Sequence, residues 1–162
     1  MIIREATVID VGIIHSLANA IWCPTYREIL EPEQIRFMLD NMYSEKALKE
    51  QMSEGIHFLL IETDGKPAGF AGYSLADHEY MIFKLHKIYV LPSEQGKGIG
   101  KKLVEHVLLL TRGNGGKIVE LNVNRLNPSL AFYKKLGFEV YQTTDIPYHH
   151  FVLNDYVMRK QL

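Results

Sequence analysis

The chain has 162 residues, of which 47% are hydrophobic and 23% charged, and its formal net charge is −1. This length suits one domain with a substantial core, so we expect a single domain over residues 1–162. The near-neutral charge gives no general reason to expect a nucleic acid or an anionic membrane as a partner, and any polyanion site must therefore be local.

The first part of the chain predicts one strand and three helices. Residues 2–8 are rich enough in β-branched side chains for a short strand, and Asp10 is placed to cap the helix that follows. Two further helices are expected at about 33–43 and 44–54, the second capped by Ser44. The first helix is expected to bury one apolar face, made of Val11, Ile14, Leu17, Ala18 and Ile21.

After residue 55 the hydrophobic period changes to that of strands. The Asp64-Gly65 pair is typical of a hairpin turn. Helices are expected at 98–112 and from Asn127-Pro128, where Asn is the cap, to Gly137. The order predicts an α/β (mixed α+β) fold, with about six to seven strands in a mixed, mostly antiparallel twisted sheet and about four helices on its two faces. Strands are expected at about 56–63, 67–75, 81–90, 117–123, 138–143 and 149–159.

Targeting and redox features favour a soluble, cytoplasmic protein. Cys23 is the sole cysteine, so no internal disulfide is expected. A lone cysteine is more often a small buried hydrophobe than a nucleophile. The first five residues carry charge too early for a signal peptide, and we expect no membrane span, which needs about 20 apolar residues.

A glycine-rich loop joins a predicted strand to a predicted helix. Its sequence is Gln95-Gly96-Lys97-Gly98-Ile99-Gly100. Glycines let the backbone fold tightly and present N–H groups to an anion, and the positive end of the following helix adds to that attraction. Lys97, Lys101 and Lys102 supply full positive charges. The combination suits a diphosphate, although glycines in such a loop also serve simply as turn residues.

Two other phosphate-binding patterns fit this loop less well. A dinucleotide-binding loop needs its third glycine three positions after the second, and Lys101 stands there. A P-loop counted from Gly96 also meets Lys101 where its second glycine should be, and no Ser or Thr follows. The loop alone suggests a pyrophosphate without identifying the ligand.

A second motif narrows the choice. From Asn127 the chain reads Asn-Pro-Ser-Leu-Ala-Phe-Tyr-Lys-Lys-Leu-Gly-Phe. Together with the glycine loop, residues 85–138 resemble the GNAT superfamily of N-acetyltransferases in motif order and spacing, and the likeness extends over nearly the whole chain. Within the superfamily, residues 85–92 and 155–160 look most like the bacterial spermidine/spermine acetyltransferase branch.

The resemblance implies acetyl-CoA as co-substrate, and no metal is expected, because no Cys or His cluster has ligand spacing. It implies that the strand ending at Val90 diverges from the strand beginning near Lys117, with pantetheine along the backbone of Ile88 and Val90. Tyr89 should point to the other face of its strand. For Lys135, a contact with the cofactor and the role of an ordinary exposed helix lysine are equally consistent with the sequence. The implied cofactor-binding residues are Ile88, Tyr89, Val90, Gln95, Gly96, Lys97, Gly98, Ile99, Gly100, Lys101, Asn127, Tyr133 and Lys135.

The expected reaction is acetyl transfer to a primary amine by direct attack in a ternary complex. An amine with a pKa of about 10.4 is almost entirely ammonium at neutral pH, so its deprotonation accounts for roughly 4 to 5 kcal/mol of the barrier. Tyr133 holds the position of the general acid that protonates the leaving thiolate in the family. His86 stands where many relatives carry a glutamate base, and histidine is suited to that role.

The sequence does not identify the molecule that accepts the acetyl group. Trp22, Tyr26 and Tyr148 lie in segments that wall the acceptor site in relatives, where they would contact an amine by cation–π attraction or serve as ordinary core aromatics. His149 and His150 are expected on one strand, pointing to opposite faces, which argues against a shared metal. Candidate acceptors are a polyamine or another small amine, and a protein N-terminus or lysine. A non-catalytic acyl-CoA-binding regulatory module is a further alternative, and relatives are often homodimers.

Overall fold

The computed structural model describes all of residues 1–162. The strands are β1 (Ile2–Glu5), β2 (His57–Thr63), β3 (Lys66–Asp77), β4 (Ile82–Val90), β5 (Ile118–Asn124), β6 (Glu139–Tyr148) and β7 (Phe151–Gln161). The helices are α1 (Val11–Tyr26), α2 (Pro32–Tyr43), α3 (Glu45–Ser53), α4 (Ile99–Gly113) and α5 (Ser129–Lys135), with short 3-10 turns at Val8–Asp10 and Pro92–Glu94.

The hydrogen-bonded strand order is β1-β2-β3-β4-β5-β7-β6, a seven-stranded mixed sheet, which confirms the predicted fold class. The chain forms two compact units. Unit 1 comprises Met1–Ser74 and Lys87–His106, and unit 2 comprises Leu75–His86 and Val107–Leu162. β3, β4 and α4 run from one unit into the other. The expectation of a single domain stays a prediction.

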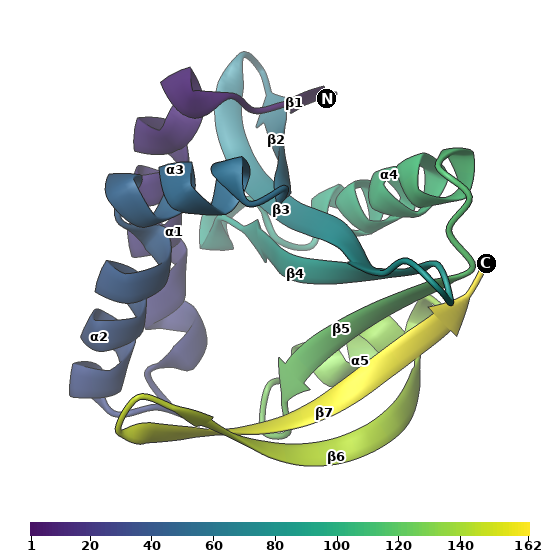
Figure 1. The fold of residues 1–162 in the computed structure, drawn as a ribbon. Coiled ribbons are helices and arrows are strands. Elements are labelled where there is room, and N and C mark those ends of the chain that lie inside the picture. Colours follow the sequence, from purple (N-terminus) through teal and green to yellow (C-terminus); the bar gives the residue numbers. More distant parts are fainter. The chain divides into compact units, whose positions relative to one another are not determined.

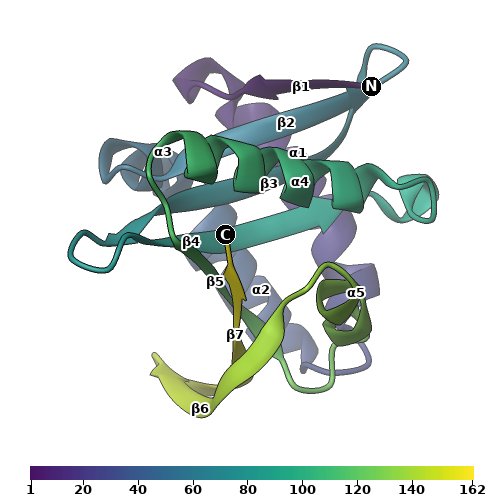
Figure 2. The same cartoon turned by 90° about the vertical axis from the view of Figure 1, so that its right-hand side faces the viewer.

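In unit 1, β1, β2 and β3 form antiparallel ladders. Figure 2 shows α4 on the near side of these strands and α1 and α2 on the far side. The predicted apolar face of α1 is buried, as its hydrophobic spacing requires. The segment Val8–Tyr26 is also long and apolar enough to cross a membrane by length and composition. A core helix meets the same criterion, and α1 buries six of its residues, Val11, Ile14, Leu17, Ala18, Ile21 and Trp22.

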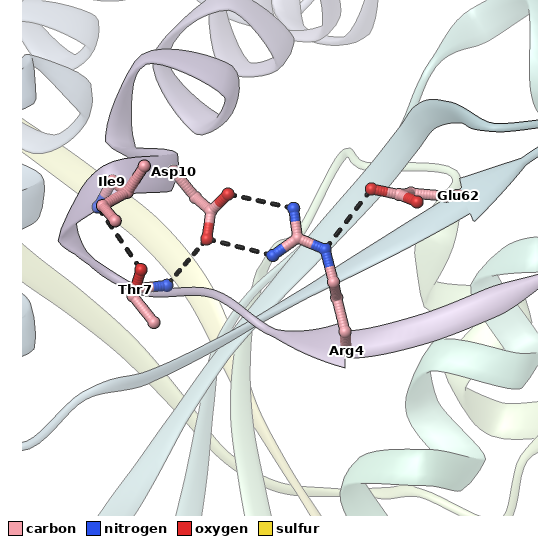
Figure 3. Close-up of polar contacts among 5 residues, drawn as sticks. All are labelled: Arg4, Thr7, Ile9, Asp10 and Glu62. Carbon is pink, nitrogen blue, oxygen red and sulfur yellow. Dashed lines mark hydrogen bonds and ion pairs between the residues drawn. The ribbon is translucent and has the colours of Figure 1, made fainter.

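The start of α1 differs from the predicted capping. Asp10 precedes the helix but makes no side-chain cap to it. Its carboxylate instead accepts the Thr7 backbone N–H at 2.9 Å, while the Thr7 hydroxyl accepts the Ile9 N–H at 3.4 Å. This reciprocal pair is a capping box for the 3-10 turn that leads into α1 (Figure 3). The prediction that Asp10 caps α1 was therefore wrong. Thr7, three residues earlier, caps the 3-10 turn that precedes the helix.

Arg4 joins β1 to this turn. Its guanidinium donates to both carboxylate oxygens of Asp10, at 2.9 and 3.0 Å, and to Glu62 on β2 at 3.4 Å (Figure 3). The hydrogen bond from Arg4 is the main reason that the pKa of Asp10 is lowered from its ordinary value. The planar guanidinium thus holds the first strand, the second strand and the start of α1 together.

In unit 2, β4 pairs with β5 in parallel, whereas β5 and β6 each pair with β7 in antiparallel fashion. Figure 1 shows β5, β7 and β6 side by side, with α5 behind them. The predicted boundary between the last two strands was wrong. β6 continues to Tyr148, and His149 and His150 form the turn, with φ of 54° at His149. They are not neighbours on a strand, because the chain reverses there.

We expect Asp10→Asn to lower the free energy of unfolding by about 1 kcal/mol at neutral pH, allowing for screening of the part-exposed Arg4. Because the native pKa of Asp10 is lowered, this stabilisation is present above the unfolded-state pKa of about 3.9 and is lost as the pH falls through the native value. Urea unfolding of both proteins from neutral to acidic pH measures it. Glu62→Gln, which removes the longer contact, should cost less. A difference that does not shrink in acid would contradict the assignment.

Candidate functional site

The glycine loop has the backbone conformation that an anion site needs. Gly96 and Gly98 both have φ of 79°, in the left-handed region that side chains disfavour. A Cβ added at either position would meet no heavy atom within 4 Å. Gly100 already lies in α4, so its place in the motif is not explained by a positive φ. Of the three glycines predicted to shape the loop, Gly96 and Gly98 therefore have a left-handed backbone, and Gly100 does not.

The loop leads directly into α4. Lys102 N–H donates to the Gly98 carbonyl at 3.1 Å, so the helical hydrogen bonds begin there and the preceding N–H groups have no partner within the helix. The exposed ammonium of Lys97 contacts Glu94 at 3.0 Å, and that of Lys101 lies 3.9 Å from Glu105. These surface pairs are weak enough to yield to a bound anion. The donors, charges and open backbone fit a pyrophosphate.

The end of β4 is held closely by its neighbours. A Cβ at Gly69 on β3 would lie 2.5 Å from the Tyr89 carbonyl oxygen, so glycine permits a close approach of the two backbones. Leu91 N–H donates to the Ala68 carbonyl at 2.8 Å, and Gln95 Nε2 donates to the Val90 carbonyl at 3.3 Å. The strand that leads into the glycine loop is thus fixed in place from both sides of Val90.

Tyr89 points to the face of β4 that carries an aromatic cluster, as its position in the alternation predicts. Its hydroxyl lies 2.9 Å from that of Tyr26, and its ring centroid lies 5.9 Å from that of Trp22. Tyr43 and Phe70 complete the cluster. Trp22 is 2% exposed, and its indole N–H has no hydrogen-bond partner. The structure therefore brings Trp22 and Tyr26 together, with Tyr26 the more exposed of the two.

In unit 2, the second motif forms α5 and the turns on either side of it. Asn127 is buried, and its Oδ1 accepts the Ser129 N–H at 2.9 Å, but the predicted cap was wrong by one residue, because the helix begins at Ser129 with Pro128 at the capping position. Tyr133 is 8% exposed, and its ring packs edge-on against Phe138 at 6.0 Å. Lys135 is exposed. Gly137, with φ of 91°, ends the helix as predicted.

The ladder between β4 and β5 is short. It pairs Ile82–Leu85 with Ile118–Leu121 and ends at Leu85 and Leu121, although both strands continue. The predicted divergence of the two strands beyond this ladder stays a prediction. His86 is the first residue of β4 past the ladder, and it is exposed. Tyr148, the third predicted acceptor residue, ends β6, and burial raises its pKa.

A family model described as "Acetyltransferase (GNAT) family" matches residues 14–138. The chain belongs to this family. The crystal structure of PaiA N-acetyltransferase from Thermoplasma acidophilum in complex with coenzyme A superposes with a TM-score of 0.86 at 26% identity, covering 99% of this chain and 98% of that one. The GNAT fold predicted from the two motifs is thereby confirmed.

Sequence relatives of this GNAT chain are more similar in sequence but overlap it over shorter stretches. An uncharacterized N-acetyltransferase of Methanocaldococcus jannaschii is 36% identical over 87 residues, 51% of this chain and 38% of that protein. Peptidyl-lysine N-acetyltransferase YjaB of Salmonella typhimurium is 33% identical over 106 residues, 63% of this chain and 65% of that protein. The chain thus spans between a third and two thirds of the length of these relatives, and they do not show the spermidine/spermine branch.

Lys87 is a feature of the GNAT chain that its sequence did not reveal. The residue is 5% exposed, and its ammonium donates to Gln51 Oε1 on α3. It lies 4.9 Å from the centroid of the Tyr43 ring and 5.6 Å from that of Phe58. Burial lowers the pKa of Lys87 from 10.5 to about 8. A lysine between a histidine and an isoleucine gives no signal of burial, because only the packing of α2 and α3 covers it.

We expect the free energy of unfolding of the wild type to rise relative to that of Lys87→Met between about pH 8 and 10.5. In this window the unfolded chain binds more protons than the native one, so stability increases with pH as the desolvated charge is lost. Urea unfolding at several pH values measures the difference. Lys46→Met, at an exposed position of α3, is the matched control and should show no such window. Parallel pH curves for the wild type and Lys87→Met would contradict the assignment.

Proposed function

We propose that the chain transfers an acetyl group from acetyl-CoA to a primary amine by direct attack in a ternary complex. The observation that carries the proposal is the loop of Gly96 and Gly98, whose left-handed backbone opens onto the first turn of α4. Family membership supports the same reading. Acetyl-CoA would supply the activated acetyl thioester. The chain would bind and orient acetyl-CoA and the amine, and would remove the proton from the amine.

Residues of unit 1 are assigned to the cofactor. Backbone N–H groups of Gly96–Lys101 would bind the pyrophosphate, with Lys97 and Lys101 adding charge. Backbone groups of Ile88 and Val90 would bond the pantetheine amides. The Val90 carbonyl already accepts from Gln95, so Gln95 sets the orientation of this backbone as well as lining the loop. The side chain of Tyr89 is engaged with the aromatic cluster, so its role in cofactor binding is that of its backbone.

Residues of unit 2 are assigned to proton transfer. Tyr133 would donate its phenolic proton to the leaving sulfur, and Phe138 fixes the plane of its ring. His86, exposed and past the end of the ladder, would receive the ammonium proton directly or through water. Asn127 uses Oδ1 within the protein, which leaves its Nδ2 to donate to the pantetheine arm. Lys135 is exposed and would add charge near the cofactor.

The acceptor is proposed to be a small amine, with a polyamine as the first candidate. Tyr26, half-buried with its hydroxyl on Tyr89, is a candidate contact for it, as is Tyr148. Trp22 would act through the cluster, since it is 2% exposed. A lysine side chain of a protein is the second candidate, because the relative YjaB bears the name peptidyl-lysine N-acetyltransferase. We propose that the enzyme is located in the cytoplasm.

A thiol-release screen with acetyl-CoA against polyamines, amino acids, aminoglycosides and short peptides tests the function. We expect Tyr133→Phe to lower kcat about a hundredfold, the effect of losing a general acid. The CoA dissociation constant, measured by calorimetry, should change less than about twofold, because the lost hydroxyl acts on the sulfur. Equal turnover in the variant would remove Tyr133 as the acid. Retained CoA binding with no release by any amine would instead identify a non-catalytic acyl-CoA-binding module.

We expect Gly98→Ala to weaken CoA binding about tenfold, because a left-handed φ costs an L-residue about 1–2 kcal/mol and the loop must shift to relieve it. Gly55→Ala is the matched control. Gly55 has φ of 99° in the turn before β2, and a Cβ there also meets no atom within 4 Å. Both variants should lose similar stability, whereas CoA affinity should fall in Gly98→Ala alone. Equal affinities by calorimetry would remove the loop as the pyrophosphate site.

A further inference from the structure

Polar residues line one face of the strands of unit 2. On β5, Val119, Leu121 and Val123 are buried, and polar residues alternate with them. α5 lies on one side of these strands (Figure 1), so the alternating polar residues point to the opposite face. The register pairs Glu120 with Arg159, Asn122 with Val157 and Asn124 with Asp155. These polar side chains on β5 and β7 therefore share a face.

Asp155 and Asn122 form a pair on this face. Asn122 Nδ2 donates to Asp155 Oδ2 at 3.5 Å, which orients the amide and turns its Oδ1 away. That Oδ1 is shielded from solvent and accepts no hydrogen bond. An unpartnered buried acceptor next to a carboxylate calls for a donor with several N–H groups.

No arginine or lysine is in ion-pair contact with the carboxylate of Asp155, unlike the carboxylates of Glu120 and Asp145. Arg159 contacts Glu120 at 2.8 Å, and Arg125 contacts Asp145 at 2.6 Å. Arg125 reaches the backbone carbonyl of Asp155 at 3.3 Å, not its carboxylate. Burial raises the pKa of Asp155, although Asn122 and the charges of Lys84 and Arg125 oppose this. A bound cation would relieve the desolvated charge.

His86 lies on the same face. Leu85 and Leu121 are partners in the parallel ladder, so the residues that follow them, His86 and Asn122, both point to the other side. β7 lies beyond β5, which places Asp155 two strands away from His86 and two residues farther along the sheet than the partner of Asn122. The proposed base and the unpaired carboxylate are therefore separate points on one surface.

We propose that Asp155 and Asn122 bind a second ammonium group of the acceptor, so that the acceptor is a diamine or polyamine. This inference rests on the proposed amine acetylation. The attacking amine must be neutral, and His86 is the residue proposed to remove its proton. A carboxylate with an amide oxygen favours a charged ammonium, which cannot attack. The two sites therefore take the two ends of one molecule.

The test compares cadaverine with pentylamine, which has the same carbon chain and one amine fewer, in the thiol-release assay. The wild type should have a KM for cadaverine about tenfold below that for pentylamine. Asp155→Asn should raise the cadaverine KM about tenfold, leaving kcat and the pentylamine KM within about twofold. Asn122→Ala should act in the same direction. Asp145→Asn, which removes an equal charge from Arg125, is the matched control and should change neither KM.

Three results would overturn the proposal. One is a wild type that does not prefer cadaverine. Another is an equal loss for both amines in Asp155→Asn. The third is a fall in kcat with a shifted pH profile, which would make Asp155 the proton acceptor instead. If Asp155→Asn does not fold, as judged by its melting temperature, Asn122→Ala decides between the outcomes.

Calorimetric titration of cadaverine into the CoA-saturated protein separates this inference from the proposed function. Binding to the wild type that is lost in Asp155→Asn, without turnover of any amine, would keep the ammonium site and reject the acetyltransferase. Turnover of both amines with the same KM, and no difference in cadaverine binding between wild type and variant, would keep the acetyltransferase and reject the site.

Discussion

The alternation of side chains along β4 is the constraint on which the proposed chemistry depends. Lys87 and Tyr89 point to the face that α2 and the aromatic cluster cover. Ile88, the one residue between them, therefore points the other way. The same strand ends at the glycine loop and begins in the ladder with β5. One strand thus carries a buried lysine, the backbone proposed to bind the cofactor and the candidate base.

Within unit 1, the anchoring of β4 uses polar groups where apolar ones would suffice for packing. Lys87 donates to Gln51, and the hydroxyls of Tyr26 and Tyr89 bond to each other. Such bonds have definite directions, so they fix the register of the strand against α1 and α3 more sharply than apolar contacts alone. The cost is a desolvated ammonium whose pKa is lowered to about 8. The position of β4 is thus defined more sharply, and the free energy of unfolding of the protein is lowered.

The assignment of roles in unit 2 follows from which polar groups already have partners. Glu120 and Asp145 are neutralised by arginines, and Asn127 is engaged in starting α5. Asp155 and the Oδ1 of Asn122 are not satisfied in this way. A buried polar atom without a partner is costly in a folded protein, so the unpartnered Oδ1 of Asn122 supports the proposed ligand site.

The sequence by itself determined the family, the order of elements and the glycine loop, because these depend on local spacing: Gly96 and Gly98 permit φ of 79°, and Gly137 ends α5. Ser44 caps α3 for the same local reason. Only the tertiary structure decided that Lys87 is buried, that Asp10 bonds Arg4 and not the end of α1, and that Asp155 meets Asn122. Each of those facts joins residues far apart in the chain or depends on a competing partner, and no local pattern records such a choice.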